Sequence, residues 1–340
     1  MTPTLAPQKQ TTRALWYVDR GQVALHEEEL VIQLAANDVL VEVLYSGISR
    51  GTERLILNGL VPASEHATMR APNQAGAFPF PVKYGYCAVG IIRQGPPDLR
   101  ERVAFCLYPH QERFIADASK INVVPPGIPP KRATLSGNME TALNAHWDAG
   151  TRAGDRVNVI GAGIVGLLTA FIARQFPGAE VTLIDIDPSR RALAEALGLA
   201  FAEPIAAPRD ADVVFHTSAS AAGLQAAIDS AAFEARIVEM SWYGDKETTI
   251  GLGGAFHAKR LQVISTQVGQ VATPNRARWT YQRRMSKAIS LLDDPRLDAL
   301  VCDELAFDDL ATDLPAVLAD VSGGLPPVIR YPAAGVPRTF

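Results

Sequence analysis

The sequence of 340 residues has few cysteines, no surplus of positive charge and no long apolar run. Its three cysteines, Cys87, Cys106 and Cys302, are widely spaced, which argues against a disulfide framework and against a thiolate zinc cluster. The formal net charge is −4 and no Lys/Arg block occurs, which argues against nucleic acid as a partner. No window approaches the roughly 18 apolar residues of a membrane-spanning helix, and Met1–Thr12 lacks the apolar core of a signal peptide. We therefore expect a soluble, cytoplasmic protein without a membrane partner.

The composition is that of a globular protein, with 48% hydrophobic and 20% charged residues, and the chain is long enough for about two domains. From residue 14 to about residue 116, short β-rich runs such as Val39–Tyr45 and Val89–Ile92 are broken by Gly and Pro. Asn73–Pro81 has the composition of a loop. The first part of the chain is therefore predicted to be mostly β.

After Pro126 the pattern changes, because apolar strands alternate with helical segments. The predicted elements are strand Arg156–Ile160, helix Ile164–Arg174, strand Glu180–Ile184, helix Ser189–Leu197, strand Val213–His216, a helix from Ala221, and strands Ala235–Met240 and Leu261–Thr266. This alternation predicts an α/β fold with a doubly wound parallel sheet. A further helix is expected around residues 283–292, before a last segment that ends near Tyr331.

A Gly-x-Gly-x-x-Gly motif lies between the first predicted strand and helix of this sheet, at residues 161–166. Gly161 permits the tight turn, Gly163 lets the backbone approach a pyrophosphate, and Gly166 lets the helix pack closely on the strand. The phosphates would lie against the amides of the first helical turn, which contains Ile164 and Val165. The alternative is a glycine-rich turn that binds no ligand.

Asp185 follows the second strand, 19 positions after Gly166. A carboxylate there would accept hydrogen bonds from the adenosine ribose and repel a 2'-phosphate, so NAD is favoured over NADP as the cofactor. Arg190 is a further candidate contact, although Arg190 and Arg191 would weaken the discrimination. The alternative role for Asp185 is to cap the next helix.

The order of a β-rich part, a dinucleotide-binding sheet and a C-terminal return resembles the medium-chain dehydrogenase/reductase superfamily of the alcohol dehydrogenase type. Val43–Ser49, Pro81–Gly90 and Leu135–Ala142 are similar to the segments that carry the three catalytic zinc ligands of that family. The resemblance implies a GroES-like, mostly β catalytic domain over 1–136 and a Rossmann NAD-binding domain over 137–272. It also implies a segment over 273–340 that returns to the catalytic domain.

The zinc ligands of the family are replaced in this sequence. Ser49 stands where a cysteine is expected, Tyr86 and Cys87 stand where His-Glu is expected, and the third ligand position falls on Gly137 or Asn138. Zinc needs three side-chain ligands of Cys, His or carboxylate type. The four-cysteine lobe that binds structural zinc in many relatives is also absent. The resemblance therefore implies an enzyme without zinc.

Two further observations bear on the metal. Ser46–Glu53 resembles the S-G-I-S-x-G-T-E segment of a zinc-lacking branch that includes bacteriochlorophyllide dehydrogenase. Cys87 departs from that branch, because an acidic residue is expected there. The alternative is a rearranged metal site that uses His66, Cys87 and Glu53.

Without zinc, side chains must stabilise the alkoxide and take its proton. Tyr86 is the first candidate, as acid/base or oxyanion donor, with Lys83 nearby to lower its pKa. The alternative is a core tyrosine with a satisfied hydroxyl. The resemblance places Ser49, Thr52 and Glu53 on a loop that faces the nicotinamide, with Ser49 and Glu53 as catalytic candidates and Thr52 as a substrate contact. Their alternative roles are turn formation and, for Glu53, pairing with a neighbouring arginine.

Polar residues follow two strands at the carboxyl edge of the predicted sheet, where open α/β sheets bind ligands. Thr217 and Ser241 are candidate cofactor contacts, and Trp242 is a candidate substrate contact. A structural role for the aromatic side chain is the alternative.

Asn138, Glu140 and Asn144 lie near the predicted domain junction, with Glu140 and Asn144 on one helical face. Asn138 is a candidate substrate contact, and a solvated or bridging polar face is the alternative. Four arginines between residues 276 and 284 form a basic cluster, which is either an anion site or a solvated helix start.

The sequence thus predicts a zinc-independent, NAD-dependent oxidoreductase that interconverts an alcohol and a ketone on a small or medium-sized polar or cyclic substrate. An alternative is a quinone or enoyl reductase that uses NADPH, against which Asp185 argues. A second alternative is a nucleotide-binding protein with little catalysis. The resemblance also implies a homodimer joined through the last strand of the sheet, within residues 261–268.

Overall fold

The computed structural model of the chain describes residues 8–320 and 324–332. The described residues divide into two compact units. The first comprises those of Met1–Ser136 and Val301–Phe340, and the second comprises Gly137–Leu300. No helix among the described residues has the length and apolar character needed to cross a bilayer.

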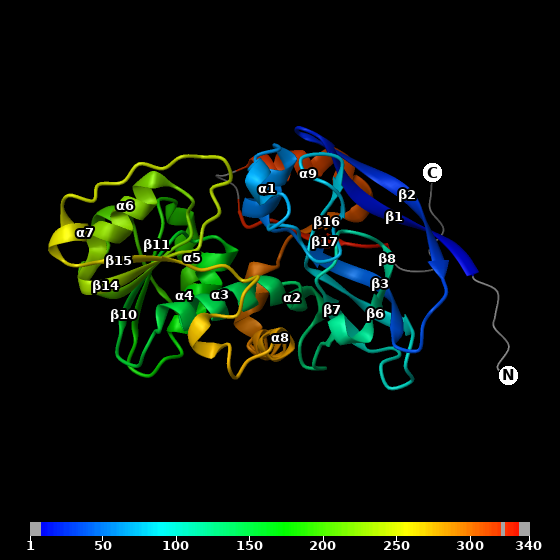
Figure 1. Cartoon of the computed structure of the whole chain (residues 1–340). Coiled ribbons are helices and arrows are strands. Elements are labelled where there is room, and N and C mark those ends of the chain that lie inside the picture. The colour runs from blue at the N-terminus through cyan, green and yellow to red at the C-terminus, as the bar shows by residue number, and fades with distance from the viewer. Residues whose placement is uncertain (1–7, 321–323, 333–340) are drawn as a thin grey trace. The chain divides into compact units, whose positions relative to one another are not determined.

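The first unit is mostly β and contains two sheets (Figure 1). One has the order β2-β1-β5-β4, and the other has the order β16-β17-β3-β6-β7-β9, with β8 paired to β3. The strands are β1 (Gln8–Asp19), β2 (Gln22–Ile32), β3 (Asp38–Gly47), β4 (Ala75–Gly76), β5 (Val82–Lys83), β6 (Ala88–Gln94), β7 (Val103–Cys106), β8 (Arg113–Asp117), β9 (Asn122–Val123), β16 (Glu304–Ala306) and β17 (Val328–Arg330). The helices are α1 (Arg50–Leu57), α2 (Pro130–Ala133) and α9 (Leu310–Ala319), with short 3-10 turns η1 (Ala63–Glu65), η2 (Ala118–Lys120) and η7 (Phe307–Asp309).

Strand β3 positions the candidate residues of the first unit, Ser49 and Glu53. Val39, Leu40 and Val41 are buried in succession, so both faces of the strand are covered at its start. β3 pairs antiparallel with β6, β8 and β17, so it is enclosed by neighbours that come from distant parts of the chain. Helix α1 begins three residues after β3 ends, at Arg50. The prediction that Ser49, Thr52 and Glu53 lie on a loop is therefore wrong for Thr52 and Glu53, which belong to the first turn of α1.

The second unit is a parallel six-stranded sheet with the order β12-β11-β10-β13-β14-β15 (Figure 1). Its strands are β10 (Arg156–Ile160), β11 (Glu180–Ile184), β12 (Ala200–Ala202), β13 (Ala211–His216), β14 (Ala231–Glu239) and β15 (Gln262–Ser265). The helices are α3 (Ser136–Ala149), α4 (Ile164–Ala173), α5 (Arg191–Ala196), α6 (Ala221–Ser230), α7 (Ala255–Ala258) and α8 (Tyr281–Ser290), with 3-10 turns η3 (Pro188–Arg190), η4 (Pro204–Ala206), η5 (Thr273–Asn275) and η6 (Pro295–Leu300). The order reverses between β10 and β13, which is the switch point at which such sheets bind ligands.

The core of this unit is built by strands and helices that are apolar nearly all round. Every residue of α4 from Gly166 to Ala173 is buried, which is typical of a helix packed inside a domain. α4 packs on β10 and β11, and α6 packs on β13 and β14. The predicted α/β fold with a Rossmann-type sheet and a mostly β N-terminal domain is confirmed. The helix predicted over Ser189–Leu197 is split into η3 and α5, and β12 was not predicted.

Candidate functional site

The dinucleotide-binding motif forms a tight turn between β10 and α4. Gly161 has a φ of +108°, a conformation that favours glycine, and its amide donates to the carbonyl of Ile184 at 2.8 Å. A Cβ atom on Gly166 would lie 1.8 Å from the carbonyl oxygen of Gly161, so only glycine allows this approach of helix and strand. A Cβ atom on Gly163, which is the N-cap of α4, would meet no atom within 4 Å. The turn therefore leaves open the side on which a diphosphate would approach the helix.

The first turn of α4 supplies the amides that the sequence assigned to phosphate binding. Ile164 and Val165 are the first two helical residues and are partly exposed. The first amide groups of a helix have no partner within the helix, and the helix dipole places partial positive charge there. The arrangement suits an anion such as a diphosphate.

Asp185 follows β11 directly and lies beside the glycine turn. Its Oδ2 accepts from the amide of Ala162 at 2.6 Å, and its Oδ1 accepts from the amide of Asp187 at 2.9 Å. The alternative that Asp185 caps the next helix is wrong, because Asp187 accepts from the amide of Ser189 and caps η3. Each carboxylate oxygen of Asp185 still has a lone pair with which to accept from a ribose hydroxyl. The residues of the turn and Asp185 therefore fit an adenosine dinucleotide.

The two arginines behind Asp185 are held by other groups. Nε of Arg190 lies 3.2 Å from Oδ2 of Asp187, and the residue is only 8% exposed. The guanidinium of Arg191 lies 4.9 Å from the centre of the Phe201 ring. The sequence predicted Arg190 as a cofactor contact, and its charge is paired with Asp187 here.

Thr217 follows β13, and its side chain contacts the glycine turn. Its hydroxyl donates to the carbonyls of Ile160 and Gly161, at 3.0 and 2.9 Å. After β14, the hydroxyl of Ser241 accepts from the amide of Ala219 at 3.0 Å. Trp242 is partly exposed next to it. The structure thus gathers the predicted contacts Thr217 and Ser241 at the same sheet edge as the glycine turn.

A buried histidine at this edge, His216, forms a pair with Glu239 that was not predicted from the sequence. His216 and Glu239 are register partners at the ends of β13 and β14. Nδ1 of His216 lies 2.7 Å from Oε2 of Glu239, and Nε2 lies 2.7 Å from the hydroxyl of Ser218. The side chain of His216 is fully buried. The signal in the sequence was a titratable residue at the end of each of two adjacent parallel strands.

In the first unit, Ser49 and Tyr86 form a polar pair. Ser49 is the N-cap of α1, but its side chain caps no helical amide. The hydroxyl of Tyr86 instead donates to its Oγ at 2.5 Å. Burial and the neighbouring Cys87 thiol raise the pKa of Tyr86, while hydrogen bonds with Ser49 and Thr52 act in the opposite direction. Tyr86 therefore keeps its proton at neutral pH.

The expectation that Lys83 lowers the pKa of Tyr86 is wrong. Nζ of Lys83 lies 2.7 Å from Oε2 of Glu28 and donates to the side-chain oxygen of Gln111 at 2.8 Å. It also lies 5.7 Å from the centre of the Trp16 ring. The two residues are close in sequence, but Lys83 belongs to β5, and its ammonium group contacts Glu28 and Trp16 of the β1–β2 hairpin.

Glu53 is fully buried and takes three hydrogen bonds. Oε1 accepts from the amide of Ser49 at 2.6 Å, and Oε2 accepts from the hydroxyl of Tyr17 at 2.8 Å and lies 3.2 Å from Nε2 of His110. Burial alone would raise the pKa of Glu53, but His110, the Ser49 amide and the Tyr17 hydroxyl stabilise the carboxylate, so its pKa is lowered. The alternative pairing of Glu53 with a neighbouring arginine is not observed.

The chain of hydrogen bonds continues away from Glu53. Nδ1 of His110 lies 2.7 Å from the hydroxyl of Ser46, which lies 2.9 Å from the hydroxyl of Tyr331. His110 and Tyr17 were not recognised in the sequence, because 57 and 36 positions separate them from Glu53. Glu53 thus holds the amide of Ser49 in place from within a rigid polar network.

Asn138 is buried in the first turn of α3, which also carries Glu140 and Asn144. Glu140 and Asn144 share a helical face, as predicted, and accept from the guanidinium of Arg284 at 2.9 and 2.6 Å. Arg284 is 2% exposed and also donates to the carbonyl of Gln270. The anion-site alternative is therefore wrong for Arg284, and so is a solvated face for Glu140 and Asn144.

The alternative metal site is not assembled. Glu53 is occupied as described, and the ring of His66 lies 5.7 Å from that of Phe78, with Nε2 3.1 Å from the carbonyl of Val61. Among the described residues, no group of three His, Cys, Asp or Glu side chains is arranged to hold a metal ion. Cys87 is buried and forms no disulfide bond.

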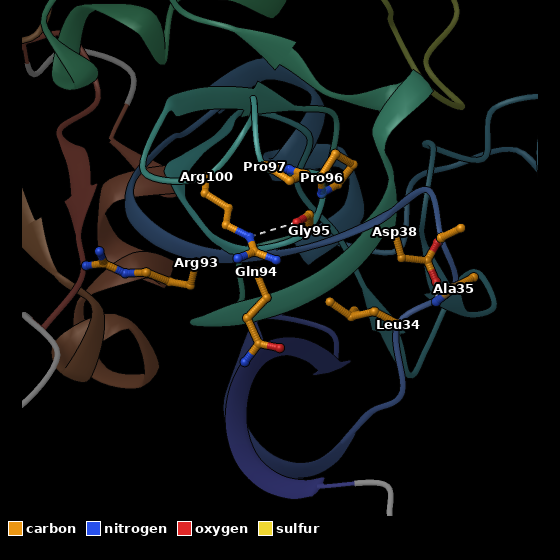
Figure 2. Close-up of a pocket in the computed structure, with 10 residues that line it drawn as sticks. Leu34, Ala35, Asp38, Arg93, Gln94, Gly95, Pro96, Pro97 and Arg100 are labelled. Atoms are coloured by element: carbon orange, nitrogen blue, oxygen red, sulfur yellow. Dashed lines mark hydrogen bonds between the residues drawn. The ribbon is translucent and has the colours of Figure 1, made fainter. Parts of the chain in front are cut away.

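A pocket of about 500 Å³ lies elsewhere in the first unit, between the loop after β2 and the loop after β6 (Figure 2). Arg100 points across it and donates to the carbonyl of Gly95 at 2.8 Å. Arg93, on its wall, pairs with Glu101 at 2.7 Å. The pocket includes none of the predicted site residues, and its two guanidinium groups are engaged with the protein, so it is not the candidate site.

The comparisons with known proteins agree with this fold. The structure matches that of L-idonate 5-dehydrogenase from Escherichia coli with a TM-score of 0.76 and 13% identity, over 96% of this chain and 99% of that one. Among the other solved structures, a dehydrogenase from Escherichia coli CFT073 contains NADH (TM-score 0.73, 14% identity, 94% and 99% covered). A protein from Sinorhizobium meliloti, named for zinc binding, is bound to NADP (TM-score 0.72, 17% identity, 95% and 99% covered).

No family model matches the chain. It is 25% identical to D-guloside 3-dehydrogenase of Escherichia coli (strain K12) over 303 residues, which cover 80% of this chain and 85% of that protein. It is 28% identical to an uncharacterized zinc-type alcohol dehydrogenase-like protein of Haemophilus influenzae over 144 residues, which cover 39% and 42%. These relatives and structures support the medium-chain dehydrogenase/reductase, alcohol dehydrogenase-like superfamily that the motifs indicated.

Proposed function

We propose that the chain is an NAD(H)-dependent oxidoreductase that interconverts an alcohol and a ketone on a polar, sugar-like or cyclic substrate, without catalytic zinc. The observation that carries the proposal is the glycine turn with the Asp185 carboxylate bound to the amide of Ala162. The names of the similar proteins support the substrate class, since they include D-guloside 3-dehydrogenase and L-idonate 5-dehydrogenase.

The preference for NAD over NADP rests on the charges around Asp185. A carboxylate beside the turn attracts ribose hydroxyls and repels a 2'-phosphate. Arg190 would be the natural partner of such a phosphate, but it is nearly buried and pairs with Asp187. The fold alone does not decide the preference, because one similar structure contains NADH and another contains NADP.

Tyr86 and Ser49 are the residues to which we assign transfer of the substrate's hydroxyl proton. Bound NAD supplies the hydride acceptor for the alcohol carbon, so the protein must handle the hydroxyl proton. Tyr86 donates to the oxygen of Ser49, which leaves the hydrogen of Ser49 free to point at a substrate oxygen. In the direction of reduction, the Ser49 hydroxyl would give its proton to the ketone oxygen as the hydride arrives, the Tyr86 hydroxyl would replace that proton on Ser49, and a solvent proton would return to Tyr86. Oxidation would follow the same steps in reverse. Glu53 positions Ser49 through its amide.

The absence of zinc from the mechanism is proposed from the side chains at the family's ligand positions. A serine hydroxyl, a tyrosine hydroxyl and an amide are poor zinc ligands beside the Cys, His and carboxylate groups that zinc prefers. Ser49 and Tyr86 are already hydrogen-bonded to one another. The motif Ser46–Glu53 supports a place in the zinc-lacking branch.

We also propose that two copies join through β15. This strand is an edge of the six-stranded sheet, and Val263 on it is 39% exposed. An unpaired edge strand can pair with the same strand of a second copy. Light scattering should give twice the mass of the chain, and a monomer would refute the dimer.

The first test is a metal-stripped assay. The purified chain is dialysed against EDTA, its zinc content is measured, and NAD reduction is followed with a panel of sugar alcohols, cyclitols and glycosides. We expect turnover with less than one zinc per ten chains. Activity that returns only when zinc is added would contradict the zinc-free mechanism. NADPH oxidation with quinones or enones in place of alcohol oxidation would indicate the reductase alternative, and NADH binding without any turnover would indicate a binding protein.

The second test is Tyr86→Phe. Because the phenol handles the proton, we expect kcat to fall by about 10²- to 10⁴-fold while the Kd for NADH stays the same. Tyr84→Phe is the matched control, since its ring packs edge-on against Tyr86 with centroids 6.1 Å apart. It should keep kcat within about threefold. Equal losses in the two variants would show that packing, not proton transfer, explains the effect.

A further inference from the structure

The hydrogen bonds around His216 run in one direction. The carboxylate of Glu239 only accepts, so in the tautomer that this pairing favours, Nδ1 of His216 carries the hydrogen between them, at 2.7 Å. Nε2 is then an acceptor, and the hydroxyl of Ser218 donates to it at 2.7 Å. The hydroxyl of Ser220 accepts from the amide of Gly223 and lies 2.9 Å from that of Ser218, to which its own hydrogen points. The oxygen of Ser218 therefore keeps one lone pair for a donor outside this chain of groups.

Ser218 is exposed and lies against the glycine turn. A Cβ atom placed on Gly161 would be 3.0 Å from the amide nitrogen of Ser218. Ser218 thus borders the surface that a dinucleotide would cover, with its Oγ on the side of Gly223, where an added Cβ atom would lie 2.2 Å from it. A phosphate carries no hydrogen to donate at neutral pH, whereas a ribose hydroxyl does. The chemistry of this position selects the hydroxyl.

Glu239 joins the two turns at this edge. Its Oε1 accepts from the amide of Ser241 at 2.8 Å, and its Oε2 accepts from the hydroxyl of Tyr243 at 3.2 Å. Ser241 in turn accepts from the amide of Ala219. One pair, the partly exposed Glu239 and the fully buried His216, therefore fixes both the turn after β13 and the turn after β14. A buried network whose members are all paired holds its groups in a single arrangement.

We propose that His216 and Glu239 are positioning residues that make Ser218 a hydrogen-bond acceptor for a ribose hydroxyl of the bound dinucleotide. The proposal rests on the proposed NAD(H) function and adds a contact to it. His216 is too deeply buried to touch a ligand and acts through Ser218. Neither the glycine motif nor Asp185 requires this contact, so it can fail while dinucleotide binding stands.

The test is a double-mutant cycle on the Kd for NADH, measured by fluorescence titration. Ser218→Ala and His216→Gln should each raise the Kd by about 2- to 10-fold, the loss expected for one hydrogen bond between neutral groups. If His216 acts through Ser218, the double variant should bind no more weakly than the weaker single variant. Ser218→Thr, which keeps a hydroxyl, should stay within about twofold of the wild type.

His146→Gln is the matched control. His146 is also a buried histidine of the second unit, with Nε2 2.9 Å from the carbonyl of Thr169 and Nδ1 2.9 Å from the hydroxyl of Thr151. It should lower the melting temperature as His216→Gln does, without changing the Kd for NADH. An effect of His216→Gln that persists in full in the Ser218→Ala background would overturn the proposal.

The outcomes separate this proposal from the proposed function. A wild-type chain that does not bind NADH refutes the function itself. A wild-type chain that binds NADH while Ser218→Ala binds it equally well refutes only the contact at Ser218. Because Ser218 is exposed, this single variant folds even if His216→Gln does not, and its Kd alone decides the question.

Discussion

Two glycines of the same turn should respond to alanine in opposite ways. In Gly166→Ala, the new methyl group would lie 1.8 Å from the carbonyl oxygen of Gly161, well inside the normal contact distance. Helix α4 must move away from β10, and overpacking of this kind costs about 1–3 kcal/mol of folding stability or more. In Gly163→Ala, the methyl group meets no atom within 4 Å, and the φ of −76° and ψ of 176° suit alanine. Its folding stability should change by less than about 1 kcal/mol.

The affinity for NADH should respond in the opposite way, with the larger effect in Gly163→Ala. The methyl group of Gly163→Ala fills the open side of the turn and displaces a diphosphate from the helix amides. Loss of a hydrogen bond to a charged group is worth about 1.5–3 kcal/mol, which corresponds to a rise in the Kd for NADH of about 10- to 150-fold. Urea denaturation and fluorescence titration of both variants measure the two quantities. A Gly163→Ala chain that binds NADH as tightly as the wild type would refute phosphate binding at this turn.

Two other predictions concern charge. Asp185→Asn keeps an oxygen for the amide of Ala162 but removes the negative charge. The ratio of the Kd for NADPH to the Kd for NADH should therefore fall by about tenfold or more. An unchanged ratio in titrations with both nucleotides would contradict the role of Asp185. Burial lowers the pKa of His146 from 6.5 to about 4. Because the unfolded chain takes up this proton below about pH 6.5 and the folded chain only below about pH 4, the free energy of unfolding should drop by about 3 kcal/mol across that interval. Urea titrations from pH 7 to pH 4 should show a shallower decline in His146→Gln, and parallel curves would count against the assignment.

The nucleotide-binding half of the site could be predicted from the sequence because its signals are local. β10, β11 and the start of α4 lie at the predicted residues, since buried parallel strands are short apolar runs and the glycines mark the turn between them. Asp185 could be predicted as a ribose contact from its spacing of 19 positions after Gly166. The pairing of His216 with Glu239 needed the strand order, which places β13 beside β14.

The arrangement of the candidate residues in the first unit depends on contacts between distant residues. The family resemblance placed the first turn of α1 on a loop, and Gly51 in that turn gives no local signal of a helix, because glycine disfavours helices. What holds this turn is the bond from the Ser49 amide to Glu53, which in turn depends on His110. Lys83 was expected near Tyr86 from sequence distance, but its ammonium group is paired with Glu28. Partners of this kind are set by the packing of several strands, which no local pattern records.

The pairing of β17 with β3 has a consequence for the order in which the protein matures. Val328 is the register partner of Gly47, so the sheet that leads to Ser49 is completed by a segment that is synthesised after the whole of the second unit. The second unit, in contrast, is a single continuous stretch, Gly137–Leu300. Contacts between such distant residues form late, because closing a long loop is entropically costly. During translation, all of the second unit is therefore available to fold before the first unit receives β17.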